Sequence, residues 1–340
     1  MRLLLFIFCL LGCTNDTPQE EDCDLPLIPY EEDSRLAFQH LQAIGSHNSY
    51  HVETTNGQIE EWEYTHDAIS VQLASQGVRQ LELDLHYVDG LDRFEVLHVP
   101  VLDPGTTCAD LAACLQEIAD FSTASPAHHP IMVLLEFKIA FDAEKADDWI
   151  QRVEDDLLNV LGRERLVLPD DVRGDHPNLR SAIENDGWPT LGDLRGKTMV
   201  VLHDGGALRD HYTAVDSPHQ NLLFPDAGGD ESLDFSAVHT LNDPFSSSSH
   251  ISRLVMKNHL VRTRADSDLY EARAQDNSRY LAALDSGAQF ISTDFAVASE
   301  DFNYWVHIPD GTPSRCNPLN APGFCESEHI EDPDKMRPCD

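Results

Sequence analysis

The sequence of 340 residues predicts an α/β fold, and more closely an irregular (β/α)8-type barrel. Two observations lead to this prediction. Segments with the apolar or alternating pattern of strands recur along the chain, and segments with the periodicity of amphipathic helices separate them. The chain is also long enough, with 41% hydrophobic residues, to bury one barrel-sized core, and its sequence contains neither an internal repeat nor a linker between two domains.

Strand and helix patterns alternate from residue 41 onward. The run at 78–87 alternates apolar and polar residues, and 131–137 is nearly all apolar, as in a strand buried on both faces. Gly77 ends one helix pattern and Ser267 caps another. Residues 204–250, rich in Gly, Asp, Ser and Pro, are expected to form a functional or decorated loop. In chain order we expect strands at 41–44, 78–87, 94–99, 131–137, 199–202, 254–256, 260–263 and 289–292, and helices at 67–76, 110–121, 142–161 and 267–284.

The first residues indicate export. Residues 1–12 have a basic start and an apolar run too short to span a bilayer, which is the pattern of a signal peptide. A small residue before Cys13 resembles a bacterial lipoprotein cleavage box and predicts that Cys13 is lipidated, with residues 13–35 as a polar tether. This would anchor the protein at the outer membrane or cell surface. Ordinary signal cleavage, with secretion, is the alternative.

The cysteines agree with an oxidising compartment. Six remain once Cys9 and Cys13 are set aside, an even number that suits three disulfides. The local pairs would be Cys108–Cys114 and Cys316–Cys325, with Cys23–Cys339 left to tie the two ends together, although the sequence does not fix the pairing. We expect the barrel at 36–305 and, at 306–340, a Cys- and Pro-rich extension stapled to it by a disulfide.

The charge excludes one class of partner. The chain has 23 basic and 60 acidic residues, a formal charge of -37, whereas nucleic-acid binding needs a basic surface. An anionic membrane would repel such a chain as well. The sequence indicates no protein partner.

Polar residues at the ends of expected strands are the candidates for chemistry. His47, after the first strand, can transfer a proton near neutral pH, and the side-chain oxygen of Asn48 can bind a hard cation. Alternation places Glu82 and Asp84 on one face of the strand at 78–87, where two carboxylates need a compensating cation unless the strand lies at a solvated edge. Glu136 interrupts the end of a buried strand, where a barrel carries its site residues.

These residues make a hard-ligand set. Asn48, Glu82, Asp84 and Glu136 offer oxygens from three successive strand ends, which predicts a calcium site with places left for water and substrate. Magnesium fits such a cluster less well, and a soft metal is not expected without thiolates.

A second histidine completes an acid–base pair. With His47 as base, His98 can give a proton to a leaving oxygen, an arrangement suited to cleavage of a phosphodiester. His86 is a rival for this role. Chance pairs are common among 17 histidines, and six others are expected to be ordinary surface or loop residues: His51, His66, His128, His129, His203 and His211.

Six motifs in order resemble the calcium-dependent phosphatidylinositol-specific phospholipase C family of bacteria. The resemblance runs from about residue 43 to residue 295. The motifs are Gly45-Ser46-His47-Asn48-Ser49, Glu82-Leu83-Asp84, Leu97-His98, Leu135-Glu136-Phe137-Lys138, Val261-Arg262-Thr263-Arg264-Ala265-Asp266 and Ser292-Thr293-Asp294.

The resemblance implies an irregular TIM barrel of the phospholipase C-like phosphodiesterase type that binds calcium and cleaves phosphatidylinositol. The inositol 2-hydroxyl would attack phosphorus, giving a cyclic inositol phosphate and diacylglycerol. His47 would be the general base and His98 the general acid, with the four oxygen ligands holding the metal.

Three further residues are expected at the substrate. Lys138 and Arg262 would contact phosphate or inositol hydroxyls, and Asp294 would orient His47 or bind inositol. The alternative is a structural ion pair among Arg262, Arg264 and Asp266. Two other functions stay open at this point, a glycerophosphodiester phosphodiesterase and a surface lipoprotein that binds calcium without catalysis. The former family usually opens with His-Arg-Gly, unlike His47-Asn48-Ser49.

Overall fold

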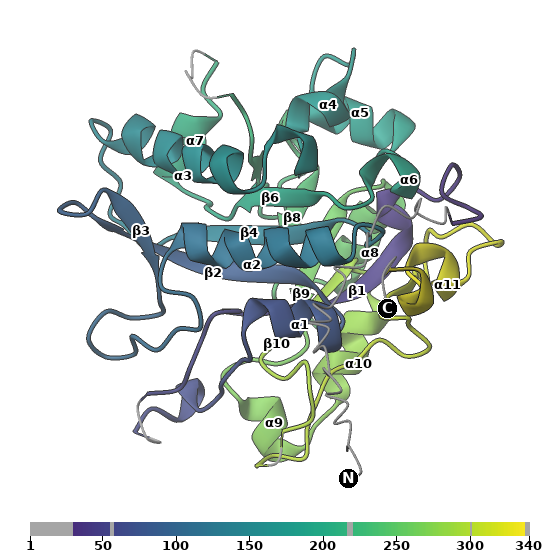
Figure 1. Cartoon of the computed structure of the whole chain (residues 1–340). Helices are drawn as coiled ribbons and strands as arrows, with labels where there is room; N and C mark the ends of the chain where they lie inside the picture. The colour runs from purple at the N-terminus through teal and green to yellow at the C-terminus, as the bar shows by residue number, and fades with distance from the viewer. Residues whose placement is uncertain (1–29, 55–57, 216–219, 300, 337–340) are drawn as a thin grey trace, which may run out of the picture.

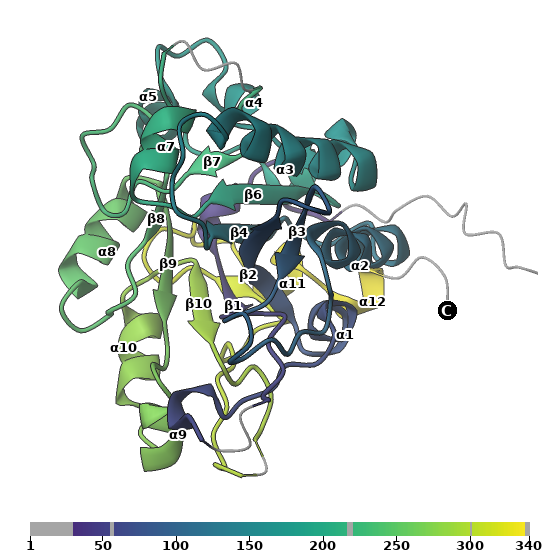
Figure 2. The ribbon, with the colours of Figure 1, turned by 90° about the vertical axis from the view of Figure 1, so that its left-hand side faces the viewer.

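A parallel barrel forms the body of the protein (Figures 1 and 2). The computed structural model describes residues 30–54, 58–215, 220–299 and 301–336. In these ranges the strands that form the barrel are, in order around it, β1 (Leu41–Ser46), β2 (Val78–Val88), β4 (Ile131–Phe137), β6 (Thr198–Leu202), β7 (Phe224–Pro225), β8 (Val238–Thr240), β9 (Leu260–Arg264) and β10 (Phe290–Thr293). Neighbouring strands along this path pair in parallel, as the sequence predicts for repeated strand–helix units.

The barrel closes at one weak point. β7 and β8 are joined by a single parallel bridge between Asp226 and Val238, and the Ala227 amide donates to the Val238 carbonyl at 2.9 Å. The strands outside the barrel are β3 (Arg93–Val96), β5 (Leu166–Val167) and β11 (Arg315–Cys316). β3 pairs with β2 as an antiparallel hairpin and β5 pairs with the start of β6. The predicted irregular (β/α)8 barrel is therefore confirmed.

Helices lie outside the ring of strands (Figure 2). They are α1 (Ile69–Ser75), α2 (Leu111–Ala124), α3 (Ala146–Val160), α4 (Pro169–Arg173), α5 (Leu179–Asp186), α6 (Leu191–Leu194), α7 (Ala207–Tyr212), α8 (Ser248–Met256), α9 (Tyr270–Ala274), α10 (Ser278–Asp285), α11 (Ser327–Ile330) and α12 (Pro333–Met336), with 3-10 turns η1 (Phe38–His40), η2 (Glu60–Trp62) and η3 (Arg163–Arg165). Within the described ranges, none of these helices has the length and apolar character that a bilayer crossing requires.

Strand alternation builds two apolar layers. Leu81, Leu83 and Leu85 of β2 face outward and join the buried cluster beneath α2 and α3. Residues of the opposite parity face inward, where Met132 and Leu134 of β4 pack with side chains from the other strands in a second cluster. The inward face changes from apolar at the beginning of the strands to charged at their ends, which sets the site at the C-terminal end of the barrel.

Three expected elements differ from the structure. Residues 254–256 are not extended, because Ile251, Leu254 and Val255 have helical spacing and are the buried face of α8. Residues 267–284 form two helices, since Gln275 after α9 adopts the left-handed region at φ 53° and ends it. The expected loop at 204–250 contains α7, β7, β8 and the start of α8, and so supplies two barrel strands too short to show a sequence pattern.

The C-terminal extension closes the opposite end of the barrel from the charged layer. β11 adds antiparallel to the start of β1, pairing with Leu41 and Gln42. Disulfides join Cys108 to Cys114 and Cys316 to Cys325, as predicted. The second lies within the extension, so it does not staple the extension to the barrel. The predicted signal peptide, lipidated Cys13 and Cys23–Cys339 pair lie outside the described residues.

A buried ion pair joins the C-terminal extension to the barrel. The Arg79 Nε, at the start of β2, donates to both carboxylate oxygens of Glu331 at 3.0 Å, and both side chains are almost fully buried. The His129 amide also donates to Glu331, at 3.1 Å. His128 and His129 lie in a loop, within the expectation of surface or loop residues, and both are fully buried there.

Glu331→Gln is expected to lower the free energy of unfolding by about 3 kcal/mol or more, because it removes the carboxylate charge that faces the buried Arg79 guanidinium. Arg79 holds the pKa of Glu331 at about 2 against the effect of burial, below its usual 4.5. A carboxyl with a lowered folded pKa stabilises the fold above pH 4.5 and loses that effect as the pH falls toward 2. In urea unfolding from pH 7 down to 3, the free energy of unfolding of the wild type should therefore approach that of the variant.

Glu328→Gln, at an exposed position of the extension, is the control. An equal loss of stability in both variants would contradict the role of the ion pair.

Candidate active site

The C-terminal end of the barrel gathers the polar inward residues of its strands. Along a barrel strand, the first inward-facing residues are apolar, and the last inward-facing residue, at the strand's C-terminal end or just after it, is polar. His47 follows β1, His203 follows β6 and Asp294 follows β10. The other members of this layer are Glu82 and Asp84 on β2, Glu136 on β4, and Arg262 and Arg264 on β9.

A carboxylate cluster lies between β2 and β4. Asp84 and Glu136 are direct register partners on the two strands. Glu82, Glu136 and His203 each place one ligand atom within 4.8 Å of the others. Asn48 reaches the same region because the amide of the next residue, Ser49, donates to the Glu82 carbonyl at 2.9 Å. The structure thus brings the four predicted ligands to one end of three strands.

The turn after β1 depends on Asn48. Its φ of 42° lies in the left-handed region, which Asn adopts more easily than most residues. Its Nδ2 donates to the Tyr64 hydroxyl at 3.3 Å, which leaves the amide oxygen available as a ligand. Gly45, just before the turn, leaves room for the Gln80 side chain of β2, because a Cβ there would lie 2.0 Å from Gln80 Oε1.

The cluster carries uncompensated negative charge. Burial raises the pKa of Asp84 to about 7, with Glu136 and Glu82 adding to the shift and Lys138 opposing it. Burial would also raise the pKa of Glu82, but the adjacent Arg262 guanidinium outweighs it, assisted by His47, and the pKa falls to about 2. The three carboxylates are therefore close to one another, with Lys138 and Arg262 as their cationic neighbours.

These residues fit a calcium ion. Neither buried oxygen of Asp84 has a hydrogen bond within normal geometry, although Lys138 Nζ lies 3.4 Å from Oδ2 and the Tyr50 hydroxyl interacts with the carboxylate. Buried carboxylate oxygens with so few hydrogen bonds have room to bind a further cation. The donor set, one amide and three carboxylates, is the hard oxygen set that calcium prefers.

His47 has the geometry of a general base. Its Nδ1 lies 2.8 Å from Asp294 Oδ1, so Nδ1–H donates to the carboxylate and leaves Nε2 as the proton acceptor. Burial and then the Arg264 charge lower the pKa of His47 in spite of Asp294, so the imidazole is neutral near pH 7. That is the form that a general base requires.

Asp294 is a positioning residue. Its Oδ2 accepts from Arg264 Nη2 at 2.8 Å while Oδ1 holds His47, and the side chain is buried. Of the two roles expected for Asp294, the geometry matches the orientation of His47, and the expected contact to inositol stays a prediction. Arg264 also lies 3.5 Å from Asp266.

His98 has a carboxylate partner that the sequence did not reveal. Its Nδ1 lies 2.9 Å from Asp103 Oδ2, and the side chain is 18% exposed. Two aromatic rings lie between His98 and His47. The centroid of the Tyr64 ring is 6.5 Å from that of His47 and 4.3 Å from that of His51, and the His51 and His98 centroids are 5.8 Å apart. The rival, His86, places its Nε2 3.2 Å from the His98 carbonyl oxygen.

Lys138 and Arg262 pair with predicted metal ligands. Lys138 Nζ lies 2.6 Å from Glu136 Oε1, and the Arg262 guanidinium is bound by Glu82 and Asn242, with Ser292 Oγ at 3.0 Å. Of the alternative ion pair among Arg262, Arg264 and Asp266, the structure contains the contact between Arg264 and Asp266, whereas Arg262 pairs with Glu82.

Sequence reasoning missed several site residues. His203 lies beside the carboxylates, and its partner Asp226, 2.8 Å away, raises the pKa of the imidazole against the effect of burial. His51 and His66 lie in loops, as expected, but they are buried next to His47 and His98, and burial lowers the pKa of His66 to about 4. The available signal was strand parity, because Met199, Val201 and His203 share the inward face of β6 and its extension. His211, partly exposed, lies 2.7 Å from Asp147.

Comparison with known proteins settles the family. The sequence matches the family model for calcium-dependent phosphoinositide phospholipase C over residues 36–93 and 89–318. The chain belongs to this family. It is a phosphodiesterase of the phosphatidylinositol phospholipase C type, and calcium is its cofactor. No curated protein sequence matches the chain significantly.

Solved structures of calcium-dependent phospholipases C share its fold. The apo form of the phosphoinositol-specific enzyme from Pseudomonas sp. superposes with a TM-score of 0.59 at 19% identity, covering 85% of this chain and 98% of that one. A myoinositol complex of the Pseudomonas enzyme gives 0.57 at 20% identity, with 84% and 96% covered. The phosphatidylinositol-specific enzyme from Streptomyces antibioticus gives 0.54 at 19% identity, with 77% and 95% covered.

Proposed function

We propose that this phospholipase C cleaves phosphatidylinositol or a related phosphodiester with His47 as general base and His98 as general acid. His47 Nε2 takes the proton of the inositol 2-hydroxyl as its oxygen attacks phosphorus. The bond from phosphorus to the diacylglycerol oxygen breaks, and His98 gives that oxygen a proton. The products are a cyclic inositol phosphate and diacylglycerol. The observation that carries the proposal is the pair of His–Asp contacts, His47 with Asp294 and His98 with Asp103, at one end of the barrel.

Asn48, Glu82, Asp84 and Glu136 are proposed to hold the calcium. Bound there, it would lower the pKa of the attacking hydroxyl and neutralise charge on the phosphate. Lys138 and Arg262 are proposed to turn toward the substrate phosphate or hydroxyls once the metal takes over their carboxylate partners. Burial lowers the pKa of His98 in the free protein, and a phosphodiester anion beside it would raise that pKa and favour the protonated form.

The test is an assay of cyclic inositol phosphate release from phosphatidylinositol, with calcium and then with a chelator. We expect activity only with calcium. Glycerophosphocholine is assayed in parallel, and its hydrolysis in place of phosphatidylinositol would favour a glycerophosphodiester phosphodiesterase. Equal release with and without calcium would exclude the proposed role of the metal.

An apolar rim supports a lipid surface as the site of action. Exposed apolar side chains lie in the loops after strands at the C-terminal end, namely Leu91, Val101, Leu102, Phe141, Phe245 and Val297. Val101, 91% exposed, lies between the two residues of the His98–Asp103 pair. Because the chain charge of -37 opposes anionic membranes, we propose that insertion of this rim supplies the attraction.

Val101→Asp is expected to weaken binding to phosphatidylinositol vesicles by roughly tenfold, the effect of losing one buried apolar side chain. Vesicle sedimentation measures the binding. The matched control is Leu281→Asp on α10, where the native side chain is 53% exposed outside the barrel. If both substitutions weaken binding equally, the rim has no special role.

We propose that Cys13 is lipidated and anchors the protein at the outer membrane or cell surface, and that residues 1–12 are removed. The support is the short apolar run that ends at Gly12-Cys13. Cys13→Ser is expected to move the protein from the membrane fraction to the soluble or secreted fraction of the producing cell. An unchanged distribution would favour ordinary signal cleavage or another mode of attachment.

A further inference from the structure

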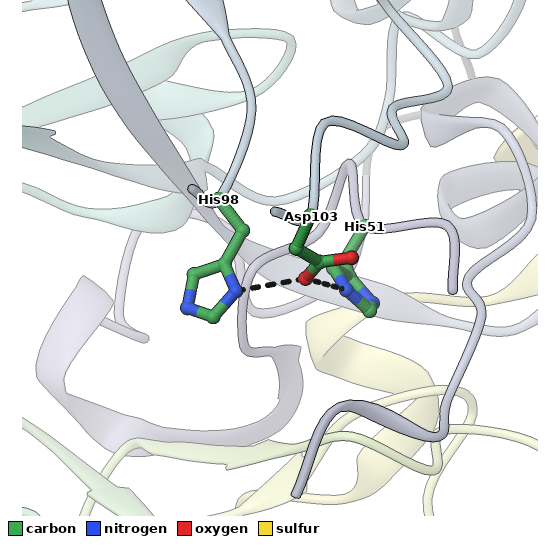
Figure 3. Close-up of side chains that lie close together, drawn as sticks. All are labelled: His51, His98 and Asp103. Carbon is green, nitrogen blue, oxygen red and sulfur yellow. Dashed lines mark hydrogen bonds and ion pairs between the residues drawn. The ribbon is translucent and has the colours of Figure 1, made fainter. Parts of the chain in front are cut away.

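A second group of metal-ligating side chains lies beside the carboxylate cluster. His51, His98 and Asp103 each place a ligand atom within 4.8 Å of the others. Figure 3 shows the two imidazoles on either side of one carboxylate, with both contacts made to the same oxygen. His51 Nε2 lies 2.7 Å and His98 Nδ1 2.9 Å from Asp103 Oδ2. His51 and Asp103 are fully buried, and His98 is partly open to solvent.

The contacts of the two ring nitrogens of His51 indicate what its Nε2 can bind. Its Nδ1 lies 2.9 Å from the Tyr64 carbonyl oxygen, which can only accept, so Nδ1 carries a hydrogen. In a neutral imidazole the other nitrogen, Nε2, then carries a lone pair. That lone pair would face a carboxylate oxygen at 2.7 Å, an arrangement that either a proton or a metal cation shared by the two atoms satisfies.

The surroundings match the outer shell of a metal site. Metal-binding histidines usually donate their second ring N–H to a carbonyl or carboxylate, as His51 does to Tyr64, and ligating carboxylates are themselves hydrogen-bonded. Thr54 Oγ1 donates to the other oxygen of Asp103 at 3.0 Å. Both ligand residues are thus held by groups outside the cluster.

The donor set differs from that of the calcium cluster. Two imidazole nitrogens and one carboxylate oxygen suit zinc and similar borderline cations, whereas calcium prefers oxygen alone. Three protein ligands would leave one position open on a tetrahedral ion, on the side where His98 is exposed.

We propose that His51, His98 and Asp103 form a second metal site that takes zinc or a similar divalent transition metal. The site shares His98 with the proposed acid–base pair. A metal on His98 Nδ1 prevents that ring from becoming an imidazolium, and the remaining N–H of a neutral imidazole is a poor proton donor at neutral pH. Zinc is therefore an inhibitor that disables the general acid while calcium stays in its own cluster. Zinc binding does not depend on the proposed function; only the inhibition does.

The test uses untagged, metal-free protein in excess calcium, titrated with zinc chloride against a chromophoric chelator. We expect one tight zinc per chain, and X-ray absorption at the zinc edge should show two imidazoles among nitrogen and oxygen ligands. Asp103→Asn and His51→Gln should each weaken binding by at least roughly 10–100-fold, the range found even for outer-shell changes. His203→Gln, in the other cluster, is the matched control and should keep the wild-type affinity.

Trp62 gives a local signal. Its ring lies 4.8 Å from that of His98 in an edge-on contact, so zinc binding should change tryptophan emission. Trp62→Phe should remove most of this change and keep the zinc affinity. Turnover of the wild type should fall with zinc and return with a chelator selective for zinc over calcium.

Several results would overturn the site. One is the absence of tight zinc binding by the wild type, and another is an unchanged zinc affinity in Asp103→Asn and His51→Gln. Loss of zinc binding in His203→Gln would assign the zinc to the carboxylate cluster. The absorption spectrum of the wild type decides the matter if the variants do not fold. If the protein binds zinc tightly but does not cleave phosphatidylinositol, the zinc site is confirmed and the proposed function is wrong.

Discussion

Replacement of His47 by alanine is expected to lower kcat on phosphatidylinositol by about 10³-fold, within the range of general acid–base catalysis. The variant loses the Nε2 that accepts the proton of the attacking hydroxyl, while Asp294 stays paired with Arg264 at 2.8 Å. The fold should persist, because the ring lies at the mouth of the barrel and outside both apolar clusters. Release of cyclic inositol phosphate, followed by 31P NMR, measures the effect, and thermal unfolding checks the fold.

His86→Ala is the matched control for the acid–base pair. It removes a histidine of the same region whose ring interacts with the backbone of His98 and Leu97. We expect its kcat to stay within a few-fold of the wild type and that of His98→Ala to fall about 10²-fold or more. A His47→Ala variant that keeps a tenth of its activity, or a His86→Ala variant as impaired as His98→Ala, would show that the roles are wrongly assigned.

Asp84→Asn is expected to remove calcium-dependent activity and, at the same time, to stabilise the calcium-free protein. Asp84 lies among like charges, and its folded pKa of about 7 exceeds the ordinary 3.8. A carboxyl whose folded pKa is raised destabilises the fold as the pH rises from 3.8 through 7, because the unfolded chain ionises more readily. In a chelator at pH 8 the variant should therefore melt above the wild type, and the difference should shrink toward pH 5.

Calcium should reverse the order of the two melting temperatures. Ligand binding stabilises the wild type in proportion to the logarithm of calcium concentration, and Asp84→Asn should lose most of that gain. Asp89→Asn, at the exposed turn between β2 and β3, is the control and should behave as the wild type. If Asp84→Asn keeps the full calcium shift, Asp84 is not a ligand.

Much of the fold followed from strand patterns of sufficient length. The alternation in β2 and the continuous apolar run of β4 placed both strands, because burial on two faces dictates their residue types. β7 and β8, of two and three residues, carry no such pattern and depend on contacts with β6 and β9. Barrel closure therefore could not be predicted from the local sequence.

The site residues, too, include some that the local sequence predicts and some that it does not. Charged residues inside apolar strands, such as Glu82 and Glu136, stand out in the sequence because burial of a charge needs a reason. Asp103 and His51 lie in loops and are 52 positions apart, and no sequence pattern shows that Asp103 turns back to contact His98, five positions before it. His203 could have been found by extending the inward parity of β6 one position beyond its end. The pairing of Arg262 with Glu82 joins residues 180 positions apart and required the closed barrel.

A crystal structure of the protein grown with calcium would show the proposed metal site itself. We expect one calcium ion bound by Asn48, Glu82, Asp84 and Glu136, with Lys138 withdrawn from Glu136 and Asp84, and with His47 still held by Asp294. A calcium ion bound elsewhere, or coordinated without Asp84 while Lys138 keeps its contacts in the cluster, would contradict the account.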